Sequence, residues 1–270
     1  MSALAAMLPD GRRLHLNHGP IDLIVEADAG HRAAAYAAAA HRFATVLDEL
    51  VAELPVLRQP VTPGALTGPV ARRMEAACLP HRPVFITPMA AVAGAVADEI
   101  VAAMATVSGL AKAYVNNGGD IALHLTGGES FTALMPGGRV TLAASDPARG
   151  IATSGWRGRS HSLGIADAVT VIAANAAAAD AAATLIANAV DLPGHLAIAR
   201  RPACELQPDS DLGDRLVTIG VGPLTAQETA DALASGFATA QAMLARGLIG
   251  AAHLTLNGQT RALTPEPAHA

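Results

Sequence analysis

The sequence is poor in cysteine and in aromatic residues. Only two cysteines occur among 270 residues, Cys78 and Cys204. They are too few and too far apart for a disulfide framework or a thiolate zinc site, so we expect two buried apolar thiols. One Trp, two Tyr and four Phe leave few rings to stack on a flat ligand, and Trp156 and Phe85 are the candidates.

An excess of positive charge and long apolar runs are also missing. Lys and Arg total 18 against 23 Asp and Glu, and the basic residues are scattered, so the sequence predicts no nucleic-acid partner. The apolar share comes largely from alanine, and no run reaches the roughly 20 strongly apolar residues of a membrane span. Residues 1–8 lack the basic segment of a secretory signal. We therefore expect a cytoplasmic protein without a membrane partner.

Common catalytic signatures are absent too. The chain contains no P-loop, no Gly-x-Gly-x-x-Gly strand–helix unit, no Gly-x-Ser-x-Gly elbow, no His-Glu-x-x-His and no paired Cys-x-x-Cys at a useful spacing. The enzyme classes that these motifs mark are therefore excluded by inspection.

Hydrophobic periodicity predicts the elements of the first part of the chain. We expect a hairpin over residues 12–17 and 21–27, then a long amphipathic helix over 30–54 that stops before Pro55. A short helix and a helix of small residues follow at 69–77 and 88–107. Small residues allow another backbone to approach closely, either for tight helix packing or beside a ligand.

An antiparallel meander is expected in the middle of the chain. Its four strands are 111–115, 121–125, 131–135 and 140–144, with the last pair turned at 136–138. The sequence Asn-Asn-Gly-Gly-Asp at 116–120 joins the first pair. Taken alone, it favours an ordinary hairpin turn, but its amides could also form a nest for an anion or a ring oxygen.

The segment from 150 to 190 is the strongest candidate for a functional site. An apolar run at 151–155 ends in a turn, a buried strand is expected at 168–173, and an alanine-rich helix begins after Asn175 as N-cap. Asp180 and Thr184 lie four residues apart, so their oxygens share one face of this helix and suit a hard cation such as Mg²⁺. The alternative is that Thr184 bonds back to the carbonyl of residue 180 and both pack within the helix.

Toward the C-terminus, the sequence predicts a surface excursion at 192–214 and a strand at 216–221. It then predicts a helix at 226–246 with Thr225 and Glu228 in a capping box. A hairpin at 251–256 and 261–263 turns at Asn257 and Gly258, and 264–270 should fray. Runs of adjacent strands mixed with helices predict an α+β fold. We expect one domain over 1–270, with largely antiparallel sheets covered by helices. Whether this domain is divided into two lobes stays open.

Three stretches, taken together and in this order, resemble the ApbE-like superfamily, whose best known members are FAD:protein FMN transferases. They are the Asn-Asn-Gly-Gly-Asp bend, the Thr-Ser-Gly turn with a downstream histidine, and the strand and helix of residues 169–184. The start of the chain and residues 88–98 and 224–250 are similar to a cytosolic, largely uncharacterised branch of that superfamily.

The resemblance implies a role for each matching residue. It places a flavin, FAD or FMN, against the bend and the Thr-Ser-Gly turn. It also places Mg²⁺ on the helix and catalytic groups beside the flavin and the metal. The implied cofactor-binding residues are Asn116, Asn117, Gly118, Gly119, Asp120, Thr153, Ser154 and Gly155; the metal ligands are Asp180 and Thr184; the catalytic residues are His161 and Asp120. For His161 an ordinary structural role stays open.

Two functions remain after the departures from that family are considered. The transferases carry a lysine–glycine pair in the segment that corresponds to residues 89–94, where this chain has only small apolar side chains and methionine. They also carry a proline soon after the segment that corresponds to His161, and this chain lacks that proline. The first function is a metal-dependent nucleotidyl or flavinyl transferase or hydrolase acting on a small-molecule ligand. The alternative is non-catalytic binding of a flavin or pterin-like heterocycle. Whether the protein forms a homodimer stays open.

Overall fold

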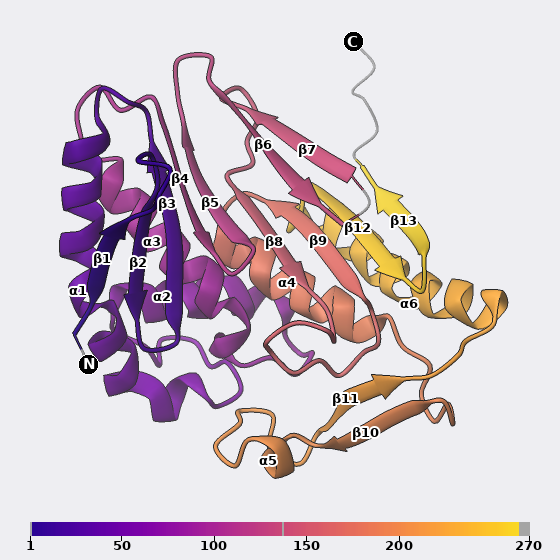
Figure 1. Cartoon of the computed structure of the whole chain (residues 1–270). Coiled ribbons are helices and arrows are strands. Elements are labelled where there is room, and N and C mark those ends of the chain that lie inside the picture. Colours follow the sequence, from indigo (N-terminus) through magenta and orange to yellow (C-terminus); the bar gives the residue numbers. More distant parts are fainter. Residues whose placement is uncertain (1, 137, 265–270) are drawn as a thin grey trace.

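The computed structural model describes residues 2–136 and 138–264. Its centre is a nine-stranded sheet in which every neighbouring pair is antiparallel (Figure 1). In spatial order the strands are β1 (Leu4–Met7), β2 (Leu14–His18), β3 (Ile21–Ala27), β4 (Lys112–Asn117), β5 (Asp120–Leu125), β8 (Gly150–Ser154), β9 (Ala168–Ala173), β12 (Ala251–Leu256) and β13 (Gln259–Leu263). The α+β class with a largely antiparallel sheet is confirmed.

The larger helices pack together behind the sheet and alongside its first strands (Figure 1). The helical elements are α1 (Arg32–Leu57), α2 (Pro69–Cys78), η1 (Leu79–His81), η2 (Pro88–Ala91), α3 (Val92–Met104), α4 (Ala176–Ala189), α5 (Ala203–Leu206) and α6 (Ala226–Ala245). One hydrophobic core runs between helices and sheet and joins residues from both ends of the chain. No helix in the described part of the chain is long and apolar enough to cross a membrane.

The expected meander is wrong in its second half. β6 (Ser130–Met135) and β7 (Gly138–Ala143) pair with each other and leave the main sheet, while β8 takes the place beside β5. The hairpin turns Ala133 and Leu142 onto Ile121 and Leu123 of β5, which builds a smaller core on the other face of the sheet. Burial of this second apolar face outweighs continued strand pairing. Gly137 of the expected turn lies outside the described residues.

Three further boundaries differ from expectation. The helix α1 continues to Leu57 with Pro55 inside it, because a proline in the last turn removes only the bond to the carbonyl of Val51, which lies on an exposed part of the helix. Within 192–214 the chain forms β10 (Ile198–Pro202) and α5, and β10 pairs with β11 (Leu216–Val221) in a separate ribbon below the main sheet (Figure 1). The edge strand β1 was not expected.

Local signals near the C-terminus are confirmed. The capping box of Thr225 and Glu228 is formed at the start of α6. Asn257 and Gly258 both have positive φ, 47° and 77°, as a tight two-residue hairpin turn requires. Of the expected frayed tail, residues 265–270 lie outside the described residues.

The helix α4 lies in the middle of the molecule and contacts strands on one side and helices on the other. Its approach to β8 is so close that a Cβ on Gly150 would lie 2.0 Å from the carbonyl carbon of Asn175. Glycine at this position therefore sets the distance between α4 and the sheet.

We expect Gly150→Ala to lower the free energy of unfolding by about 1–3 kcal/mol, because backbone must move to admit the methyl group. Urea unfolding measures the change. Gly250→Ala is the matched control, since the nearest atom to its new Cβ is the Ile172 oxygen at 3.6 Å. Equal losses in the two variants would show that the close approach is not limiting.

Candidate functional site

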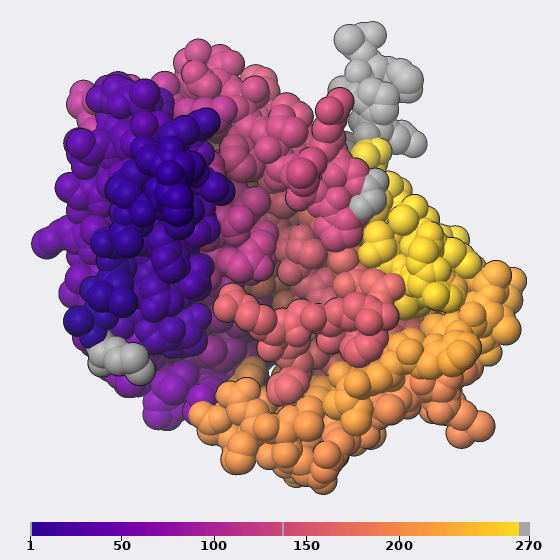
Figure 2. Space-filling model, in the orientation of Figure 1, coloured from indigo at the N-terminus to yellow at the C-terminus, as the bar shows by residue number. Residues whose placement is uncertain are grey.

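A cavity of about 600 Å³ lies where the β4–β5 turn, the end of β8, the side of α4 and the start of α3 meet. The molecular surface is hollowed near this junction, between the loop after β8 and the orange β10–β11 segment (Figure 2). Nine residues predicted from the sequence line it. They are Asn117, Gly118, Asp120, Thr153, Ser154, Gly155, His161, Asp180 and Thr184. The other two predicted residues, Asn116 and Gly119, are not among the described residues that line the cavity.

The β4–β5 turn is built by its own asparagines. Gly118 and Gly119 have φ of 66° and 114°, a region that glycine enters without cost. The Asn116 side chain accepts a hydrogen bond from the Gly119 amide at 2.8 Å, and Asn117 Nδ2 donates to the Ala93 carbonyl at 3.1 Å. Asn116 therefore shapes the turn, and Asn117 ties it to the start of α3.

Asp120 begins β5 and is buried, with 8% of its surface exposed. Its Oδ1 accepts a hydrogen bond from the Thr153 amide at 3.1 Å, and the Thr153 hydroxyl lies 2.9 Å from the Thr170 hydroxyl. Burial raises the pKa of Asp120 to about 7, against the opposing effects of the Thr153 amide and the Arg159 charge. Its carboxyl group is therefore poised to gain or lose a proton near neutral pH.

Asp180 points from α4 toward the beginning of α3, where its Oδ2 accepts a hydrogen bond from the Gly94 amide at 3.0 Å. Burial raises the pKa of Asp180 well above its ordinary value, and the nearby charge of Asp120 raises it further. Asp180 nevertheless keeps some of its surface open at the cavity. The two carboxyl groups therefore share one poorly solvated region.

Thr184 lies one turn further along α4 and also lines the cavity. In the described part of the chain it forms no hydrogen bond to the carbonyl of Asp180, although Thr229 and Thr239 make that kind of bond in α6. The back-bonded arrangement considered from the sequence is not formed. The hydroxyl oxygen of Thr184 is available to a bound group.

Asp98 was missed by sequence reasoning. It lies on α3, is 8% exposed, and accepts hydrogen bonds from the first two amides of α4, Ala176 at 3.0 Å and Ala177 at 2.9 Å. Asn175 accepts from the third amide, that of Ala178, at 2.8 Å, which confirms its N-cap role. Two adjacent carboxylates, Asp98 and Glu99, inside an otherwise apolar helix were the available signal. Asp98 fixes the start of the helix that carries Asp180.

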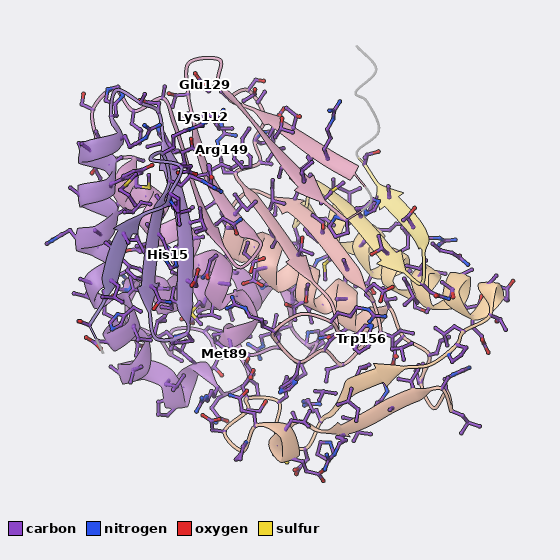
Figure 3. The ribbon with its side chains drawn as sticks, viewed as in Figure 1. His15, Met89, Lys112, Glu129, Arg149 and Trp156 are labelled. Carbon is purple, nitrogen blue, oxygen red and sulfur yellow. The ribbon has the colours of Figure 1, made fainter. Side chains whose placement is uncertain are left out.

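The loop after β8 contributes His161 and three basic or aromatic neighbours. His161 is half-buried, and no hydrogen bond joins it to a described residue. Arg157 is engaged by Asp167 at 2.8 Å, and its guanidinium lies 4.5 Å from the centre of the Trp156 ring. Trp156, labelled in Figure 3, is not among the described residues that line the cavity, whereas Phe85 is, and the stacking of either ring on a ligand stays a prediction.

Arg159 is an arginine of this site whose charge acts on Asp120 from beyond ion-pair distance. It lines the cavity, and a Cβ on Gly118 would lie 2.5 Å from its Nη2. None of the described residues forms an ion pair or hydrogen bond with it, whereas Arg58 on the far rim is paired with Asp209 at 2.6 Å. Sequence reasoning missed Arg159 because an exposed arginine in a loop carries no local signal.

The expected surface excursion supplies one wall. Residues Gln207 and 209–212 line the cavity. Asp211 accepts a hydrogen bond from the Thr87 hydroxyl at 2.5 Å, and Asp209 pairs with Arg58, so the segment is tied to the helical side at two points. These tethers bring residues far apart in the chain to one site.

The donor set suits a hard divalent cation. Two carboxyl groups and a hydroxyl line one cavity, and the Arg159 charge acts on Asp120. The described residues contain no group of three or more His, Cys, Asp or Glu arranged to hold a metal. A cation here would take its remaining ligands from backbone oxygens, water or a phosphate, as Mg²⁺ commonly does.

Comparisons with known proteins identify a matching family model and several relatives. A family model described as AbpE bacteria matches residues 5–262. A UPF0280 protein of Methanothrix thermoacetophila is 37% identical over 165 residues, 54% of this chain and 64% of its own length. One of Methanococcoides burtonii is 38% identical over 135 residues, 47% of this chain and 54% of its own.

A third relative extends further. The UPF0280 protein of Methanopyrus kandleri is 33% identical over 175 residues, 62% of this chain and 69% of its own length. The chain thus spans between about half and about two thirds of the curated relatives it matches. Their names state no ligand or reaction.

We expect the metal-free protein to lose stability as the pH rises from the unfolded pKa of Asp120, 3.8, through its folded value of about 7. The folded state holds this proton more tightly, so its contribution is complete at low pH and is lost on deprotonation. Urea unfolding across this window, with a chelator present, measures the effect.

Asp120→Asn provides the comparison for this pH dependence. The amide oxygen still accepts from the Thr153 amide but cannot ionise, so the pH profile of the variant should be flatter than that of the wild type. Parallel profiles would show that Asp120 does not titrate in this range.

Proposed function

The chain belongs to the family described as AbpE bacteria, and we propose that its cavity binds a nucleotide-type ligand, a flavin or another heterocycle joined to phosphate, together with Mg²⁺. The observation that carries this proposal is the pair of buried carboxyl groups, Asp120 and Asp180, at the wall of a cavity of about 600 Å³. That volume lies within the usual range of small-molecule sites, about 300–1,000 Å³.

The cation would be held by Asp180 and Thr184, with Asp120 close by. Two carboxyl groups in one buried region repel each other when both are ionised, and a divalent cation removes that repulsion. Bound Mg²⁺ would supply neutralisation of the charge that develops on phosphoryl oxygens. Its open positions would be filled by a ligand phosphate.

Arg159 and the β4–β5 turn would hold the rest of the ligand. Arg159 lines the cavity and forms no ion pair with a described carboxylate, although its charge acts on Asp120, and a guanidinium pairs well with phosphate. It provides a cation in a chain that lacks the lysine of the related transferases. The ring would lie between the backbone of Gly118 and the side chain of Phe85, both of which line the cavity.

We also propose that the protein catalyses a reaction of the bound ligand. Asp120, with its pKa near neutrality, is suited to move a proton, and His161 lines the same cavity. We propose a metal-dependent nucleotidyl or flavinyl transferase or hydrolase. The missing lysine–glycine pair and proline favour the alternative, a non-catalytic binding protein for a small heterocycle, and the experiments below separate the two.

Mg²⁺ affinity is expected to fall at least about tenfold in Asp180→Ala, because loss of even an indirect metal contact commonly costs 10–100-fold. Thr184→Val should weaken binding less, since it removes a neutral ligand. Calorimetric titration of the wild type and both variants measures the affinities. Asp48→Ala, an exposed change on α1, is the matched control, and equal affinity for it and for Asp180→Ala would count against the site.

We expect slow turnover of FAD. Incubated with FAD and Mg²⁺, the protein should bind the dinucleotide or cleave it slowly, and it should be a poor flavinyl transferase. Misplacement of reacting groups by about 1 Å can cost on the order of a hundredfold in rate, and two contacts of the related transferases are missing.

The assay uses FAD, Mg²⁺ and an acceptor peptide bearing a threonine. Rapid FMN attachment that Asp180→Ala abolishes would contradict the expectation of slow transfer. Binding without any product would favour the non-catalytic alternative. Arg159→Gln should weaken FAD binding while leaving Mg²⁺ affinity unchanged, which separates the phosphate contact from the metal site.

A further inference from the structure

A second cavity of about 560 Å³ lies on the face of the sheet opposite α3 and α4. Side chains alternate between the two faces of a strand, and on β4 Val115 enters the main core while Tyr114 packs against the smaller core on the other face. The cavity is lined from β3, β4, β6 and the beginning of α1. The lining residues used below are Arg12, Glu26, Asp28, Arg32, Lys112, Tyr114 and Phe131.

Two of its three basic residues are already neutralised. Arg12 Nη2 lies 2.5 Å from Glu26 Oε1. Lys112 Nζ lies 3.8 Å from Glu129 Oε2 and donates to the Ser130 carbonyl at 2.5 Å; Lys112 and Glu129 are labelled near the upper end of β4 and β5 in Figure 3. These residues form a polar rim whose charges balance.

Asp28 lines the same cavity but forms no ion pair with the third basic residue, Arg32. One oxygen of the Asp28 carboxylate contacts His31 Nδ1 at 2.7 Å, and the other accepts from the Ala111 amide at 2.9 Å. These bonds direct the carboxylate toward the backbone at the junction of β3, α1 and β4. Its acceptor capacity is therefore used within the fold.

Arg32 is the basic residue of this cavity for which the described residues provide no ion pair. Among the described residues no carboxylate forms an ion pair with it, and its Nε is buried without a hydrogen-bond partner. The nearby Tyr36 hydroxyl interacts with the guanidinium but is neutral, since burial raises its pKa. A buried donor without an acceptor is costly. An anionic group in the cavity would supply the missing acceptor.

An aromatic pair stands in the same cavity. The ring centres of Tyr114 and Phe131 are 5.1 Å apart, with 52° between their planes, and both side chains keep part of their surface exposed. This chain has few aromatic residues, and two of them meet here. Their exposed faces offer an apolar surface to a third ring.

We propose that this cavity binds a small aromatic anion, a planar ring that carries one acidic head group. The head group accepts hydrogen bonds from the Arg32 guanidinium, and the ring packs on Tyr114 and Phe131. The site is separate from the nucleotide-type cavity, because it lies on the opposite face of the sheet and shares no lining residue with it.

The test is a titration of the full chain, labelled with ¹⁵N, followed by amide chemical shifts. Phenyl phosphate and benzoate carry a ring with a phosphate or a carboxylate, and inorganic phosphate carries no ring. Saturable shifts at Ala29 and Lys112 with phenyl phosphate or benzoate are expected, and the tighter of the two identifies the head group. Absence of saturable shifts there, or shifts confined to Gly118 and its neighbours, would overturn the proposal.

Variants locate the two parts of the ligand. Arg32→Gln should weaken phenyl phosphate at least about tenfold, as expected when a charge-assisted hydrogen bond is lost. Phe131→Leu should weaken phenyl phosphate and leave inorganic phosphate unchanged. Arg139→Gln, an exposed change on β7 outside the cavity, is the matched control.

Two outcomes of the variants would contradict the site. They are equal affinity of wild type and Arg32→Gln for phenyl phosphate, and inorganic phosphate binding as tightly as phenyl phosphate. If Arg32→Gln fails to fold, Arg32→Lys replaces it, because lysine keeps the charge and removes Nε. Unchanged affinity in Arg32→Lys would then also overturn the assignment.

Discussion

The close packing of α4 is the constraint on which the rest of the structure depends. A Cβ on Gly94 would lie 2.2 Å from the Ala176 oxygen, and one on Gly164 would lie 2.2 Å from the Ala187 oxygen. Together with Gly150, these glycines let three segments touch the α4 backbone. A helix so enclosed needs alanine on most faces, because larger side chains would push its neighbours away. The run of alanines in α4 is consistent with this packing.

That packing concentrates negative charge in the interior. Asp98 is offset by two amides at the start of α4, whose partial positive charge favours an anion. Asp180 accepts from the Gly94 amide and Asp120 from the Thr153 amide, and burial still raises the pKa of each carboxyl group. Asp120 and Asp180 are the two of these carboxyl groups that line the cavity. A group whose charge is poorly offset is where a metal or a proton has most effect.

The sheet separates two environments. Its helix-covered face carries the main core and the cavity of Asp120 and Asp180, whereas the β6–β7 hairpin covers part of the other face and forms one wall of the second cavity. Because side chains alternate along β4, Asn117 serves one side and Tyr114 the other. A single strand thereby contributes to two unrelated sites.

The sequence by itself determined what depends on neighbours within a few residues. The cap at Asn175, the capping box of Thr225 and Glu228, the turn at Asn257 and the shared face of Asp180 and Thr184 are set by short-range hydrogen bonds and by helical spacing. Tertiary structure decided the exit of β6–β7 from the sheet, the capping of α4 by Asp98 and the meeting of Arg159 with Gly118. These depend on burial and charge between residues distant in the chain, where many pairings satisfy the same local pattern and only the assembled core selects one.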